Sequence, residues 1–146
     1  MPKGPLATIK VAMLTITKEL RFDAAHRLYL PLLSEKENRK LFGKCCQFHG
    51  HTYRLRVTVA GPVQSTGMIL NFTDLKKIIK DRILSRYDHA DLNTLDEYRD
   101  IPPTAENMAK FIFRELWPCL NSRGVDLKKI TLYETPDSWA EVSDDH

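Results

Sequence analysis

The stretch CCQFHGHTYRLRVTV, residues 45–59, contains the clearest strand pattern in this 146-residue chain. From His49 onward every second residue is apolar or aromatic, apart from two histidines, and the residues between them are mostly Thr and Arg. This alternation predicts a strand with one buried face and one exposed face. Its inward parity is His49, His51, Tyr53, Leu55, Val57 and Val59. Histidines at i and i+2 of a strand point to the same side, close enough together to bind one metal ion. The alternative is that these two residues only hydrogen-bond locally on either side of Gly50.

A second alternating segment lies upstream, at residues 11–25. Its apolar parity runs through Leu14, Ile16, Leu20, Phe22 and Ala24 and continues to His26. If the two strands pair as a hairpin, His26 faces His49 and His51. Three neutral imidazoles with a fourth position left open are typical of a catalytic zinc site. Zinc suits imidazole ligands, and no carboxylate cluster in the sequence competes for another metal.

The remaining pattern predicts two helices followed by two strands. A helical stripe covers 73–86, residues 87–103 form a loop, and a second helix begins after Thr104 and ends at Pro118 and Gly124. Ser34 and Glu37 predict a capping box on an additional short helix. Strands follow at 128–135 and 138–142. The order ββααββ favours an α+β fold, an antiparallel four-stranded sheet with both helices on one face and open edges that a subunit partner could cover.

Composition and charge restrict the functional class. The net charge of +3 comes from scattered basic residues, which argues against nucleic acid as a partner. No apolar run approaches 18 residues, and no signal peptide is recognisable, so we expect no membrane association. Three cysteines, two of them adjacent, are typical of a reducing cytosol and predict a cytoplasmic protein. We expect a single domain over 1–146, with 1–10 and 143–146 as loose tails.

Cys45 is a candidate nucleophile or base. It follows Lys44 and lies four residues before His49, and a thiol near a cation and a metal has a lowered pKa. The alternatives are a small buried cysteine, or a structural zinc site formed with Cys46, although the chain has no second Cys-x-x-Cys pair.

Three further positions carry candidate functional groups. Asp88 and His89 can converge in a turn as an acid/base pair, although a turn alone also explains this dipeptide. Glu134 shares the inward parity of its strand, where its carboxylate could accept two N–H bonds from a flat heterocycle, or it turns to solvent at the strand end. Thr104 and Glu106 need be no more than a helix cap and a first-turn acid.

Together these segments resemble one family. They are FDAAHRL (22–28), LSEKENRKLFGKC (33–45), Cys-x-x-x-His-Gly-His (45–51), TGMILNFTDLKK (66–77), DHADLN (88–93), PTAENMA (103–109) and LYET (132–135). In this order they resemble the 6-pyruvoyl-tetrahydropterin synthase and 6-carboxytetrahydropterin synthase family, from about Leu20 to Val142.

The resemblance implies a tunnelling fold that forms a barrel in a trimer, two of which stack as a homo-hexamer. It also implies a zinc enzyme acting on 7,8-dihydroneopterin triphosphate with loss of triphosphate. By resemblance, His26, His49 and His51 are the zinc ligands, Cys45 is the base, and Asp88 with His89 is a second acid/base pair. Glu134 would anchor the pterin ring, with Thr104 and Glu106 beside it.

The resemblance also implies two possible products. The compact spacing from Cys45 to His51 is similar to the branch that forms 6-carboxytetrahydropterin for queuosine-type pathways, which is the product we expect. The 33–45 loop and NFTDLKK are similar to the 6-pyruvoyl branch of tetrahydrobiopterin synthesis, which is the alternative. A folate-precursor branch carries Glu where this chain has Cys46. Cys46 could also act as the base in place of Cys45, and a non-catalytic, zinc-stabilised module that binds pterins or purines is the alternative outside enzymes.

Overall fold

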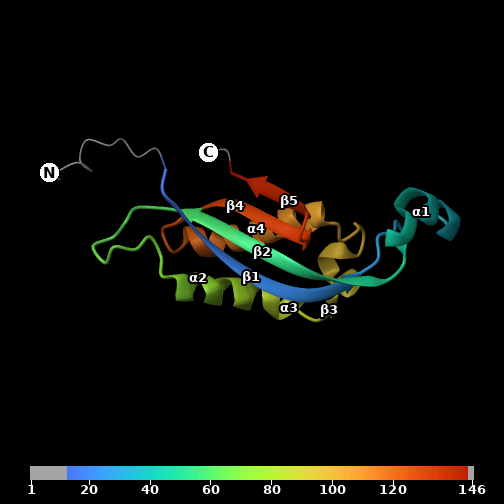
Figure 1. The fold of residues 1–146 in the computed structure, drawn as a ribbon, viewed down its shortest axis with the longest axis horizontal. Helices are drawn as coiled ribbons and strands as arrows, with labels where there is room; N and C mark the ends of the chain where they lie inside the picture. Colours follow the sequence, from blue (N-terminus) through green and yellow to red (C-terminus); the bar gives the residue numbers. More distant parts are fainter. Residues whose placement is uncertain (1–12, 145–146) are drawn as a thin grey trace.

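The computed structural model describes residues 13–144, which form one sheet with its main helices packed on one face (Figure 1). The sheet order is β3-β1-β2-β4-β5, and every neighbouring pair is antiparallel except β1 and β3. The strands are β1 (Thr15–His26), β2 (His49–Ala60), β3 (Ala90–Asp91), β4 (Asp126–Thr135) and β5 (Ser138–Ser143). The helices are α1 (Glu35–Phe42), α2 (Phe72–Ile79), α3 (Ser85–Tyr87) and α4 (Ala105–Asn121).

The predicted α+β class is confirmed, but the sheet differs from the prediction. It is mixed and has a fifth strand, because β3 arises within the segment predicted as a loop and pairs in parallel with the end of β1. A strand of two residues has no periodicity that a sequence pattern could reveal. Its formation depends on a contact between Ala24 and Ala90, which are far apart in the chain.

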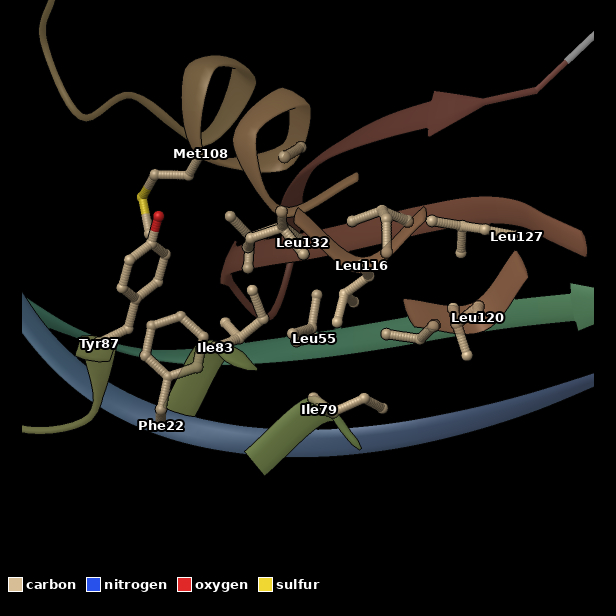
Figure 2. Close-up of a cluster of buried hydrophobic side chains, with 14 of the residues drawn as sticks. Phe22, Leu55, Ile79, Ile83, Tyr87, Met108, Leu116, Leu120, Leu127 and Leu132 are labelled. Carbon is tan, nitrogen blue, oxygen red and sulfur yellow. The ribbon is translucent and has the colours of Figure 1, made fainter. Parts of the chain in front are cut away.

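The core lies between the sheet and the helices α2 and α4 (Figure 2). The inward parity of β2 is fully buried from Tyr53 to Val59, as the alternation predicts. Phe22 of β1 stacks on Tyr53, with ring centroids 5.0 Å apart. Burial of each large apolar side chain contributes roughly 1.5–3 kcal/mol. This face anchors the strands, and the opposite face of the sheet carries mainly polar and charged residues.

Two helix predictions are confirmed. The stripe over 73–86 forms α2, a π turn over Lys80–Leu84 and α3 in direct succession. The capping box is present at α1, because the Ser34 hydroxyl accepts the Glu37 N–H and the Glu37 carboxylate accepts the Ser34 N–H, both at 3.1 Å.

The predicted end of the second helix is wrong at Pro118 and confirmed at Gly124. Helix α4 continues through Pro118 to Asn121, and Gly124 then adopts a φ of +76° in the turn that ends it. A proline interrupts a helix by leaving the carbonyl four residues earlier without a donor. Here that carbonyl belongs to exposed Arg114, so water can satisfy it, while Leu116 and Leu120 remain buried on the other side of the helix.

The predicted tail at 1–10 lies outside the described residues. The predicted tail at 143–146 begins too early, since Ser143 ends β5 and the N–H of Asp144 donates to the Lys128 carbonyl at 2.9 Å. No helix in the described part of the chain is long and apolar enough to cross a membrane.

Candidate metal centre

Strands β1 and β2 bring the three predicted histidines together. The two strands pair without a break from Thr15 opposite Ala60 to His26 opposite His49, and His51 lies opposite Ala24. This is the hairpin on which the prediction depended. The long connection between β1 and β2, residues 27–48, contains α1 and extends away from the sheet (Figure 1); it is called the arm below.

The three imidazoles face one point. The Nε2 atoms of His26 and His49 are 3.1 Å apart, and one ligand atom of each of the three rings lies within 4.8 Å of the other two. His26 is fully buried, while His49 and His51 are partly exposed. The cluster therefore has a closed side towards the core and an open side towards solvent.

Hydrogen bonds to main-chain carbonyls set the orientation of two rings. The Nδ1–H of His26 donates to the Pro103 carbonyl at 2.8 Å, and the Nδ1–H of His49 donates to the Gln47 carbonyl at 2.7 Å. A carbonyl can only accept, so the proton of each neutral ring lies on Nδ1 and Nε2 presents a lone pair. Two lone pairs 3.1 Å apart repel each other unless a cation lies between them. The donor set therefore fits a metal ion, and such carbonyl contacts are typical around metal-binding histidines.

Burial supports the neutral forms of His26 and His51. Desolvation lowers the pKa of His26 to about 4 against the opposing hydrogen bond to the Pro103 carbonyl, and the nearby His49 and His51 act in the same direction as desolvation. Desolvation also lowers the pKa of His51, against the opposing influence of Glu134. The Nε2 atom of His51 is buried and has no hydrogen-bond partner. An uncharged imidazole with an unsatisfied, buried nitrogen is suited to bind a metal ion.

Glu134 points inward beside this cluster, as its parity predicts. Its Oε1 atom lies 3.6 Å from His26 Nε2 and 3.7 Å from His51 Nε2, and its side chain is 27% exposed. The alternative, that Glu134 turns to solvent at the strand end, is therefore wrong. The carboxylate is close enough to contact a ligand held at the three histidines.

Asp88 and His89 converge in a turn, as predicted. His89 Nδ1 lies 3.0 Å from Asp88 Oδ1, and His89 adopts a φ of +63°. The turn is tied to β1, because the Asp23 N–H donates to Asp88 Oδ1 at 3.0 Å and the His89 N–H donates to the Asp23 carbonyl. A cavity of about 440 Å³ is lined by both Asp23 and His89 together with His51. His89 of this pair therefore opens onto the same space as one of the candidate metal ligands.

The two adjacent cysteines have different environments. Both lie in the 3₁₀ turn Gly43–Cys46 of the arm, where Cys45 is exposed and Cys46 is only 7% exposed. The Leu28 N–H donates to the Cys45 carbonyl at 2.7 Å, which holds this turn near the end of β1. Neither thiol belongs to the histidine group. An exposed thiol can reach a substrate and a buried one cannot, so the geometry favours Cys45 over Cys46 for chemistry.

Thr104 and Glu106 take different places. The Thr104 hydroxyl accepts the Asn107 N–H at 3.1 Å and caps α4, so its local role is confirmed. Exposed Glu106 lines a cavity of about 400 Å³ with Glu134 and Trp139. The structure thus brings Glu106 and Glu134 to one cavity, while the Thr104 hydroxyl accepts from its helix and keeps its own proton free to donate, so its role beside the pterin ring stays a prediction.

Sequence reasoning missed two residues at this end of the sheet. The Asp23 carboxylate accepts the Thr52 hydroxyl at 2.5 Å and forms a second acidic group with Asp88 and His89. Asn93 accepts the Arg27 N–H at 2.8 Å and donates to the Arg27 carbonyl at 3.0 Å, which fastens the loop after β3 beside His26. Asp23 lies on the outward-facing side of β1, within the motif segment FDAAH. Its place in that segment is the one sequence signal that could have marked it as a candidate site residue.

Comparison with known proteins identifies the family of this chain. The family model described as 6-pyruvoyl tetrahydropterin synthase matches residues 15–145. The chain belongs to this family. Within the 6-pyruvoyl tetrahydropterin synthase family, it is 40% identical to the 6-pyruvoyl tetrahydrobiopterin synthase of Homo sapiens, over 84% of this chain and 86% of that protein. It is 33% identical to the 6-carboxy-5,6,7,8-tetrahydropterin synthase of Haemophilus influenzae, over 90% and 100%. The solved 6-pyruvoyl tetrahydropterin synthase of Caenorhabditis elegans aligns with a TM-score of 0.83 and 31% identity, covering 94% and 99%.

Proposed function

We propose that this chain is a zinc-dependent carbon–oxygen lyase that converts 7,8-dihydroneopterin triphosphate into a tetrahydropterin with loss of triphosphate. The observation that carries the proposal is the pair of unprotonated Nε2 atoms of His26 and His49, 3.1 Å apart and completed by the unpartnered Nε2 of His51. The names of the relatives support the substrate class, since they are tetrahydropterin synthases of both kinds.

In this proposal His26, His49 and His51 hold the zinc ion, which would supply a Lewis acid that polarises the hydroxyl groups of the substrate side chain. Glu134 accepts N–H bonds from the pterin ring and so orients the side chain across the cluster. The Cys45 thiolate removes a proton from the activated carbon, and the Asp88–His89 pair exchanges the second proton across the shared cavity. Glu106 contributes a further acceptor on the side of Glu134.

The product we propose is 6-carboxytetrahydropterin, from the compact Cys-x-x-x-His-Gly-His spacing of Cys45 to His51. A 6-pyruvoyl product is the second candidate, and the higher identity to the human relative than to that of Haemophilus influenzae favours it, 40% against 33%. Mass spectrometry of the product decides between them after the zinc-loaded protein is incubated with 7,8-dihydroneopterin triphosphate. A 6-carboxy product with released acetaldehyde supports the first candidate, and a 6-pyruvoyl product supports the second.

Unchanged substrate, from protein shown to be folded and zinc-loaded, would contradict the enzyme proposal and leave the non-catalytic binding module. The two also differ in their response to chelation. A binding module that depends on structural zinc unfolds when the metal is removed, whereas the enzyme stays folded and loses turnover.

We also propose the homo-hexamer of two stacked trimers with a closed barrel. Support comes from the sheet, since among residues 13–144 no strand pairs with the outer edge of β5 and β3 covers only Ala24 and Ala25 of β1. Edges of this kind are commonly paired with another chain. Light scattering tests the assembly, and a monomeric mass at working concentration would overturn it. The cytoplasmic location stays a prediction.

A further inference from the structure

Two arginines face each other on the side of the sheet away from the helices. Arg21 of β1 and Arg54 of β2 are direct partners in the antiparallel register. Side chains at directly opposite positions lie about 5 Å apart at Cβ, and like charges there are destabilising. The repulsion between the two arginines therefore needs a compensating interaction. The simplest one is an anion bound between the two guanidinium groups.

The adjacent pairs of the same two strands make the contrast clear. Two residues along, Glu19 is opposite Arg56, and they form an ion pair with Nε 2.8 Å from Oε1. In the other direction Asp23 is opposite Thr52 and accepts its hydroxyl. On this face the neighbouring polar pairs are therefore complementary, and the arginine pair between them is not.

Neither guanidinium of the pair forms a direct ion pair with a carboxylate, although Glu19 interacts with both at longer range. Within residues 13–144, no carboxylate lies at ion-pairing distance from Arg21 or Arg54, and the Nε–H of Arg54 is buried without an acceptor. The Arg54 guanidinium carbon lies 4.3 Å from the centroid of the Tyr133 ring, which fixes its direction. A stacked guanidinium with free donors is preorganised to bind phosphate, because little side-chain freedom is lost on binding.

The two arginines open onto the candidate active site. A cavity of about 420 Å³ is lined by Arg21 and Arg54 together with His51 and Glu134. It therefore combines donors for an anion with a carboxylate that accepts N–H bonds. A ligand with a hydrogen-bonding ring and an anionic tail matches this combination.

We propose that Arg21 and Arg54 form the subsite that binds the phosphoryl tail of the substrate and the triphosphate released from it. This inference rests on the proposed function for the identity of the ligand, whereas the arginine pair and its cavity are independent of that function. The carboxylates beside the pair do not cancel the positive charge, because Glu19 and Asp23 are outnumbered by Arg21, Arg54 and Arg56 on this face.

The test uses inorganic triphosphate as the probe, measured by isothermal titration calorimetry on the zinc-loaded full chain. Arg21→Gln and Arg54→Gln should each weaken binding by about tenfold or more, the scale of one charge-assisted hydrogen bond. Arg56→Gln is the matched control, since it removes an arginine from the same face and strand that already has a partner. It should change the affinity by less than about twofold, and higher ionic strength should weaken wild-type binding.

Steady-state kinetics give a second readout. Arg21→Gln and Arg54→Gln should raise KM for the pterin triphosphate by a factor similar to the loss of triphosphate affinity, with kcat changed much less, because the arginines contact the tail and not the reacting carbons. Equal effects of all three variants on triphosphate affinity would overturn the proposal. So would a change of oligomeric mass in the Arg21 and Arg54 variants alone, which would assign the pair to an interface between copies.

The two proposals fail in different ways. If the wild-type protein binds triphosphate through the arginine pair but converts no pterin, the subsite stands and the proposed reaction is wrong. If the protein converts pterin and both arginine variants keep wild-type KM and triphosphate affinity, the reaction stands and the subsite is wrong.

Discussion

Asn38 stabilises the arm and thereby fixes the position of Cys45. We expect Asn38→Ala to make the arm open more easily and to leave Cys45 less firmly placed. Asn38 lies in α1 and is 2% exposed. Its Oδ1 accepts the Leu30 N–H at 2.7 Å, and its amide nitrogen lies 3.0–3.2 Å from the carbonyl oxygens of Leu30, Leu33 and Ser34. One side chain therefore holds the segment that follows β1 against the helix that leads to Cys45.

The expected magnitude follows from this geometry. An amide NH₂ has two protons, so only two of the three carbonyl contacts are full hydrogen bonds at one time, and Asn38→Ala removes about three bonds in total. At a net contribution of about 1 kcal/mol each, local opening of the arm becomes easier by about 3 kcal/mol. That change corresponds to roughly a hundredfold larger open population.

Hydrogen exchange followed by mass spectrometry is the direct assay, because it reports local opening separately from global unfolding. Amides of 28–46 should exchange about a hundredfold faster in Asn38→Ala, whereas amides of the buried strand β2 should change little. Turnover should also fall, since the Cys45 carbonyl is held by the Leu28 N–H within the loosened segment.

Asn71→Ala is the matched control for this experiment. Asn71 caps α2 by accepting the Thr73 N–H at 2.8 Å, so its loss should cost about 1 kcal/mol at a site outside the arm. Unchanged exchange in the arm of Asn38→Ala would refute the reasoning. Equally fast exchange in the arm of both variants would show that Asn38 has no special role there.

Three further predictions concern the metal, the thiols and the core. Chelation of zinc should leave far-UV circular dichroism unchanged and abolish turnover, because the apolar core is complete without the histidines; loss of the spectrum would favour the binding module. Iodoacetamide should modify exposed Cys45 at least about tenfold faster than buried Cys46, as peptide mapping would show, and Cys45→Ala should retain zinc by elemental analysis while losing turnover. Inactivation by Cys46→Ala alone would reverse that assignment. Leu116→Ala should lower the free energy of unfolding in urea by about 2–5 kcal/mol, because Leu116 is fully buried on α4.

Signals that act within a few residues were read correctly from the sequence. The alternation of β1 and β2, the helical stripe after Asn71 and the Ser34 capping box each depend on contacts inside one element. The local rule failed at Pro118, because the sequence does not say that the carbonyl left without a donor belongs to an exposed residue, Arg114. Here tertiary packing through Leu116 and Leu120 keeps α4 intact.

By itself the sequence determined the family, the α+β class and the convergence of His26, His49 and His51. These follow from alternation and motif spacing, which are properties of the order of residues in the chain. Only the tertiary structure decided that Glu134 lies 3.6 Å from His26, that β3 joins the sheet, and that Arg21 meets Arg54 across two strands. Each of these depends on register between segments joined by long connections, and a shift of one residue would turn the side chains to the other face. Parity says which side of each strand faces the core, and the register between strands is then settled by how the buried faces pack together.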